Sequence, residues 1–135
     1  MMNIVRWLRG RRGDMVEGAL TLPLMALVTL ALVNLAMAGY ASVTANNAVN
    51  YAARVASVSQ NNVTGEAMNA ANRALSAGIG SYAVSIQADN YPGGLVQVAV
   101  AWEVPNLFGS LMPLFGQTNE PLNGEARSAF RKEGW

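Results

Sequence analysis

Residues 18–38 read GALTLPLMALVTLALVNLAMA and contain no charged side chain. At about 1.5 Å per residue, a helix over this run is about 31 Å long, which is close to the ~30 Å hydrocarbon thickness of a bilayer. The run therefore predicts one transmembrane helix, which we place over residues 15–38. Pro23 lies within it and removes a backbone donor, so we expect a helix kink of the kind that membrane helices tolerate.

The charges on either side of the run predict its orientation. Four arginines precede it with no acid among them, and the next basic residue after it is Arg54. They are Arg6, Arg9, Arg11 and Arg12. The positive-inside rule places the basic tail, residues 1–14, in the cytoplasm and everything after Ala38 outside it. A short basic tail is not the clustered basic surface that nucleic-acid binding needs, so we expect no nucleic-acid partner.

A cleaved secretory signal is the main alternative to a retained anchor. The chain has the basic start and the apolar run of such a signal, and Ala36-Met37-Ala38 fits the A-x-A cleavage pattern. The apolar run is, however, longer than the roughly 7–15 residues typical of a signal. Sequence compatible with a helix also continues past the possible cut. The sequence therefore favours an anchor that stays in the protein.

The composition excludes several function classes. Hydrophobic residues make up 52% of the chain and charged residues only 13%, against about 25% charged in soluble domains, so we expect contact with lipid or other subunits. Cysteine and histidine are both absent, which removes disulfides, thiolate or imidazole catalysis and most transition-metal sites. The carboxylates are scattered singly along the chain. We therefore expect no enzyme activity, no catalytic residues, no cofactor and no metal.

The rest of the chain predicts an α+β fold. Residues 39–62 read as an exposed helical stem with an alanine-rich face, which packs against partner helices or against the protein's own domain. Residues 63–135 read as a small extracytoplasmic domain, with a second helix over 65–77 that Thr64 caps. Alternation over 82–89 and 96–104, separated by turn residues, predicts an antiparallel hairpin. A last strand is expected over 122–130.

Two further features have more than one interpretation. The apolar segment 107–115 is too short to span a bilayer; a short helix or loop packed on the core is favoured, with the outer leaflet or a partner as alternatives. Glu17 lies at the edge of the apolar run, and a carboxylate inside a bilayer costs about 2.5–3.5 kcal/mol. It either pairs locally with Arg12 or neutralises a positive group on an adjacent subunit and so sets helix register.

The N-terminal region resembles the start of TadE-like pseudopilins, the subunits of tight-adherence systems within the type IV pilin superfamily. The residues that carry the resemblance are Arg11-Arg12-Gly13, Val16-Glu17 and ALTLPL at 19–24. NAVNYAAR at 47–54 is similar to the polar, alanine-rich helix extension of that family, and ARSAFRKEG at 126–134 to its closing strand.

The resemblance implies a pilin-like structural or assembly subunit of an envelope filament or secretion system, in the bacterial inner membrane. Its partners would be the lipid bilayer and other pilin-like subunits, with self-association. It also implies cleavage by a prepilin peptidase between Gly13 and Asp14, after which Glu17 could meet the new N-terminal amine of a neighbour. Glu17 is the fourth residue after Gly13, where the family has its acid fifth, and Gly18 replaces an aromatic. An uncleaved single-span accessory subunit, docked on another membrane complex, is therefore the alternative.

Overall fold

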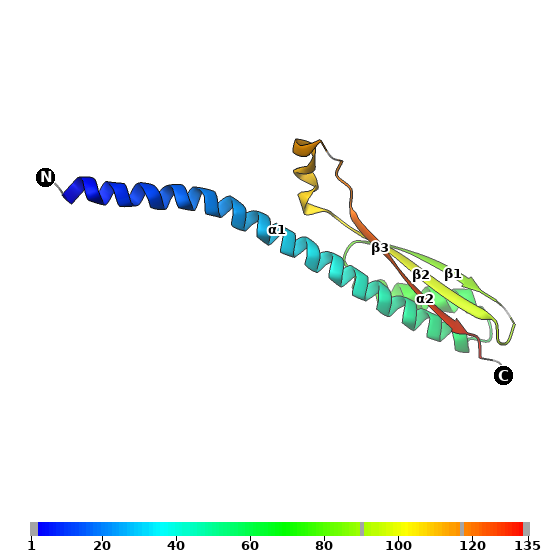
Figure 1. Ribbon diagram of the computed structural model, residues 1–135. Coiled ribbons are helices and arrows are strands. Elements are labelled where there is room, and N and C mark those ends of the chain that lie inside the picture. The colour runs from blue at the N-terminus through cyan, green and yellow to red at the C-terminus, as the bar shows by residue number, and fades with distance from the viewer. Residues whose placement is uncertain (1–2, 90, 117, 134–135) are drawn as a thin grey trace. The chain divides into compact units, whose positions relative to one another are not determined.

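The computed structural model describes residues 3–89, 91–116 and 118–133, with side chains described for all of these except 3–14, 110, 114 and 115. The chain divides into two compact units, residues 1–33 and 34–135. The α+β class predicted from the sequence is confirmed. In chain order the elements are α1 (Asn3–Val58), α2 (Val63–Leu75), β1 (Ser81–Ala88), β2 (Leu95–Val104), the 3₁₀ helices η1 (Leu107–Ser110) and η2 (Met112–Phe115), and β3 (Leu122–Arg131) (Figure 1).

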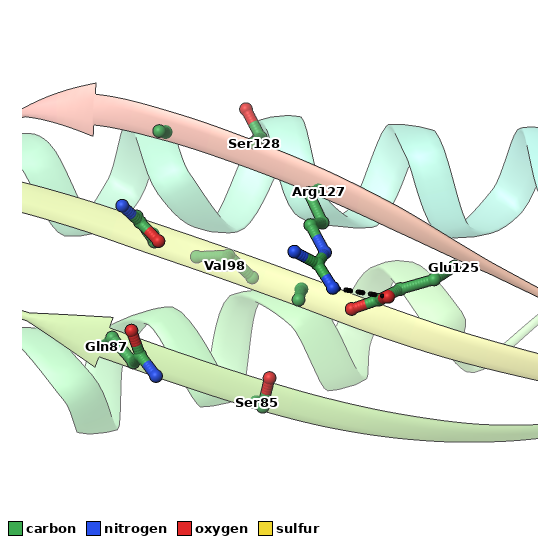
Figure 2. A pocket seen from close by; sticks show the side chains of 9 residues that line it. Ser85, Gln87, Val98, Glu125, Arg127 and Ser128 are labelled. Carbon is green, nitrogen blue, oxygen red and sulfur yellow. Dashed lines mark hydrogen bonds and ion pairs between the residues drawn. The ribbon is translucent and has the colours of Figure 1, made fainter.

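The three strands form one antiparallel sheet in the order β1-β2-β3. Tyr82 pairs with Trp102 in the predicted hairpin, and Val98 of the central strand pairs with Ser128 of β3. Burial alternates along β1 and β2, as a sheet with one covered face requires. The predicted hairpin and last strand are therefore confirmed. Figure 2 looks onto the open face of the sheet and shows the helices behind it.

The main core joins both helices to the inner face of the sheet. The helices contribute alanines, whereas the central strand contributes valines that are no more than 1% exposed. The buried members of this core are Ala45, Ala48, Val49, Ala52, Ala53, Ala56, Val63, Ala67, Ala70, Ala71, Leu75, Val96, Val98, Val100 and Ala126. The alanine-rich face after Gly39 thus packs against the protein's own domain. The sequence left two alternatives open for this face, partner helices or the protein's own domain. The structure shows that the protein's own domain covers it.

The start of α2 differs from the prediction. Asn62, and not Thr64, is the N-cap, and its side chain accepts a hydrogen bond from the Gly65 backbone N–H at 3.2 Å. Asn62 adopts the left-handed conformation (φ 52°, ψ 49°), which asparagine tolerates better than most residues. Thr64 lies inside the helix, because that turn brings the chain into helical geometry two residues earlier than the sequence indicated.

Residues 105–121, which we call the 3₁₀ connection, join β2 to β3 through η1 and η2. None of its described residues belongs to the main core or packs against it. Gly109 is buried, while the side chains of Leu107, Phe108 and Met112 are half-buried. The sequence left a loop or a short helix open for this segment, and the structure forms two short 3₁₀ helices. Whether the segment as a whole packs on the core stays a prediction, because the side chains of residues 110, 114 and 115 are not described.

Candidate functional site

The first feature of functional interest is the apolar surface of α1 over residues 15–33. Every described residue there is exposed except Gly18, which is half-buried, and Leu20 is 72% exposed. Leaving a leucine in water rather than burying it costs about 1.5–3 kcal/mol. Within the described residues, α1 is the one helix long and apolar enough to cross a membrane, with 6% of its apolar window buried. Length, composition and exposure together fit a surface solvated by lipid.

Glu17 lies at the cytoplasmic edge predicted for this surface and is exposed. Its backbone carbonyl accepts a hydrogen bond from the Thr21 hydroxyl at 2.6 Å. Among the described side chains the one ion pair joins Glu125 to Arg127, so the Glu17 carboxylate has no described cationic partner. The side chain of Arg12, its local candidate, lies outside the described residues. A register role for Glu17 remains a prediction.

The other sites predicted near the N-terminus fall where side chains are not described. The backbones of Gly13 and Asp14, the candidate processing site, lie within α1. The side chains of Asp14 and of the orienting arginines lie outside the described residues; these are Arg6, Arg9, Arg11 and Arg12. Pro23 lies inside α1, and its effect on the helix axis stays a prediction.

Asn34, the polar residue near the end of the apolar run, is 6% exposed. Its side-chain Nδ2 donates to Oδ1 of Asn106 at 2.9 Å, and its Oδ1 accepts from the Leu107 backbone N–H at 3.0 Å. The donor and the acceptor of the Asn34 side-chain amide are thus both hydrogen-bonded within the chain. The partner of Asn34 is therefore the protein's own 3₁₀ connection.

Asn106 extends this contact across the 3₁₀ connection. Its Oδ1 also accepts from the Phe108 backbone N–H at 3.1 Å, capping η1, and its Nδ2 donates to the Glu120 carbonyl at 3.2 Å. We call the pair Asn34 and Asn106, with these four hydrogen bonds, the asparagine clamp. It fastens both ends of the connection to α1. Sequence reasoning missed it because 72 positions separate the two asparagines.

The outer face of the sheet carries a shallow open hollow (Figure 2). Arg127 Nη2 donates to Glu125 Oε2 at 2.8 Å, and both side chains are exposed. The hydrogen bond from Arg127 lowers the pKa of Glu125, and the same bond raises the pKa of Arg127. The described residues include no cluster of acids, histidines or cysteines that could hold a metal ion. The described side chains make this face of the sheet a polar surface.

Comparison with known proteins yields one match. The TadE-like protein family matches residues 15–54, a stretch of α1 that contains the exposed apolar surface and much of the buried alanine face. No curated protein and no solved structure matches the chain. The apolar helix and this match fit a membrane-anchored protein. Over residues 15–54 the chain is therefore similar to the TadE-like protein family, as Val16-Glu17 and the ALTLPL sequence indicated.

Proposed function

We propose that the protein is a pilin-like structural or assembly subunit of an envelope filament or secretion system of the tight-adherence type. The observation that carries the proposal is that the exposed apolar surface of α1 lies within the stretch that matches the TadE-like family. In this proposal residues 15–38 insert in the bacterial inner membrane. The basic tail stays in the cytoplasm and the α+β domain lies outside it.

Other subunits are proposed to bind the surfaces of α1 that the protein's own domain leaves exposed. After Ala38 the alanine face is covered, and the opposite stripe of the helix is exposed. This stripe contains Val43, Asn47, Tyr51 and Arg54. It presents aromatic, aliphatic and polar side chains on one face of the helix, which suits contact with a helix of another subunit. Copies of this chain or other pilin-like subunits are its proposed partners.

Glu17 is proposed to set the register of such an assembly. It lies exposed at the edge of an apolar surface, where burial between helices would remove its carboxylate from water. A prepilin peptidase that cuts between Gly13 and Asp14 would create a positive amine near this level, and the amine of a neighbouring subunit would neutralise Glu17. Charge pairing of this kind is favourable only at one helix offset, which is why it sets the register.

The mature N-terminus of the native protein tests the processing step. Intact mass and N-terminal sequencing should show a chain that begins at Asp14. A chain that still begins at Met1 would favour the second candidate, an uncleaved single-span accessory subunit. That candidate rests on two observations, the early position of Glu17 relative to Gly13 and the glycine at Gly18.

Orientation and assembly are tested with single cysteines, because the natural chain has none. In intact spheroplasts a membrane-impermeant maleimide should label Ser85→Cys on the outer sheet face and leave Met15→Cys, which lies after the proposed cut, unlabelled. Cross-linking through Val43→Cys should give dimers, which Glu17→Ala abolishes and Glu17→Asp retains. Dimers that persist in Glu17→Ala, with membrane insertion unchanged, would remove Glu17 from the assembly contact.

A further inference from the structure

The 3₁₀ connection is rich in apolar residues, and yet its described side chains lie outside the main core. No charged residue occurs between Glu103 and Glu120, and the segment reads PNLFGSLMPLFGQTN over 105–119. Its half-buried members Leu107, Phe108 and Met112 belong to no buried cluster, and Pro113 is exposed. Apolar side chains left outside a core indicate a surface that something other than water covers.

The asparagine clamp fixes the level of this segment along α1. Asn34 lies four residues before Ala38, the end of the predicted transmembrane helix, which corresponds to about 6 Å along a helix. Interfacial elements bury their apolar faces about 5–10 Å into the boundary between headgroups and acyl chains. The neighbouring Leu35 is 70% exposed. The clamp therefore holds η1 beside a part of α1 that exposes an apolar side chain.

Several backbone donors of the connection are paired within the chain. Leu107 donates to Asn34, Phe108 to Asn106 Oδ1, Gly109 to the Asn106 carbonyl at 2.9 Å and Leu111 to the Phe108 carbonyl at 2.9 Å. Pro113 has no N–H to satisfy, and Gly116 donates to the Pro113 carbonyl at 3.2 Å. Non-helical backbone at membrane depth requires this internal pairing, because each unpaired group costs several kcal/mol there.

We propose that the 3₁₀ connection inserts into the outer leaflet beside α1 and forms a second contact between the domain and the lipid. Leu107, Phe108 and Met112 enter the interface, while the clamp sets their depth. Lipid is the occupant, because Asn34 holds η1 at the level of the exposed Leu35 of α1 and no charged residue occurs between Glu103 and Glu120. The inference rests on the proposed membrane insertion.

Depth-dependent quenching tests the proposal on the full chain. Met112→Cys, Leu24→Cys and Ser85→Cys are each labelled with a nitrobenzoxadiazole dye in vesicles of phosphatidylethanolamine and phosphatidylglycerol. A shallow doxyl lipid should quench the label at position 112, a deep doxyl lipid the label at position 24, and neither the label at position 85. Aqueous iodide should quench only the label at position 85.

The outcomes separate this inference from membrane insertion itself. If the label at position 24 is quenched and the label at position 112 is reached by iodide alone, the connection lies in water and the inference is wrong. If the label at position 112 is protected from both lipid and iodide quenchers, a second copy or a protein partner covers it, and the inference is again wrong. Failure of lipid quenching at position 24 would contradict insertion, which is the separate proposal.

A second variant tests the role of the clamp. Asn34→Leu removes both side-chain hydrogen bonds to the connection while keeping the helix apolar, and Thr29→Leu is its control, because Thr29 bonds only the Met25 carbonyl of its own helix at 2.8 Å. Asn34→Leu should reduce shallow quenching at position 112 and leave quenching at position 24 intact, whereas Thr29→Leu should change neither. Unchanged quenching at position 112 in Asn34→Leu would show that the clamp does not set the depth.

Discussion

The two parts of α1 are both apolar, but they differ in which side chains are exposed. Over residues 15–33 the helix carries leucines, valines and methionines, and all of them are exposed. From Ala41 to Ala56 one face consists mainly of alanine, and these alanines are 0% exposed. Small side chains let a helix approach a sheet and a second helix closely, whereas lipid accepts large side chains at no cost. Residue size, and not hydrophobicity, thus distinguishes the part of the helix packed on protein from the part suited to lipid.

A charge placed in the first part gives the largest expected effect. Leu27→Arg should cost about 2.5–3.5 kcal/mol of insertion free energy, because a guanidinium near the bilayer centre is poorly solvated. Val43→Arg is the control, since Val43 is exposed beyond the apolar run. Alkaline carbonate extraction of membranes should release a larger share of Leu27→Arg than of Val43→Arg. Equal extraction of the two variants would mean that residues 15–33 do not lie in lipid.

A larger side chain in the second part tests the close packing. Ala52→Leu should destabilise the domain by about 1–3 kcal/mol, because extra methylenes in a filled core force shifts of side chains and backbone. Asn47→Leu adds similar bulk on the exposed stripe and should have little effect. Urea unfolding of the full chain in detergent micelles, followed by circular dichroism, measures both. If both variants unfold at the same urea concentration, the alanine face is not closely packed.

The cap of α2 stabilises the helix that packs on the other side of the alanine core. Removing this cap should lower the free energy of unfolding by less than Ala52→Leu does. Asn62→Ala removes the acceptor for the Gly65 N–H and places alanine at positive φ, so it should cost about 1 kcal/mol. Asn62→Gly keeps the left-handed turn accessible and should lose only a few tenths of a kcal/mol. The same unfolding assay ranks them. A glycine variant as unstable as the alanine variant would contradict this account.

The smallest effect is expected on the outer sheet face, which is exposed to water and not to lipid. Arg127→Gln should raise the pKa of Glu125 toward its ordinary value, because it removes the hydrogen bond that lowers it. A lowered folded-state pKa gives stability above the unfolded-state pKa that is lost as pH falls through the folded-state pKa. Water screens this exposed pair, so the unfolding midpoint should hardly move at neutral pH. An NMR titration of the Glu125 carboxyl carbon checks the direction.

Local patterns in the sequence predicted most of the fold. The alternation of apolar and polar residues in β1 and β2, with the turn residues between them, was sufficient to predict the hairpin. The charge-free run was sufficient to predict the apolar part of α1. The cap of α2 was misplaced by two residues, because a left-handed Asn62 has no signal in hydrophobic periodicity. The pattern also could not decide what covers the alanine face, since alanine suits a partner helix and an intramolecular sheet equally.

The candidate site was less predictable, because it depends on contacts between distant parts of the chain. Glu17 and Gly13 could be recognised from the local sequence, because they lie beside the long apolar run of α1. Asn34 stood out too, as an amide among apolar residues, but its partner Asn106 follows a strand and looks like an ordinary turn residue. Only the three-dimensional fold brings them to 2.9 Å, and with them the apolar connection to the level of the membrane anchor.

The position of β3 at the end of the chain has a consequence for the order of events during export. β3 supplies Ala126 and Phe130 to the core, and after it the Glu133 N–H donates to the Ser57 carbonyl at 2.9 Å near the end of α1. Chains emerge and fold from the N-terminus onward. In the proposed orientation the anchor is therefore committed to the bilayer while its alanine face is still bare. The part of the core that β3 supplies, Ala126 and Phe130, can close over that face only after β3 has crossed.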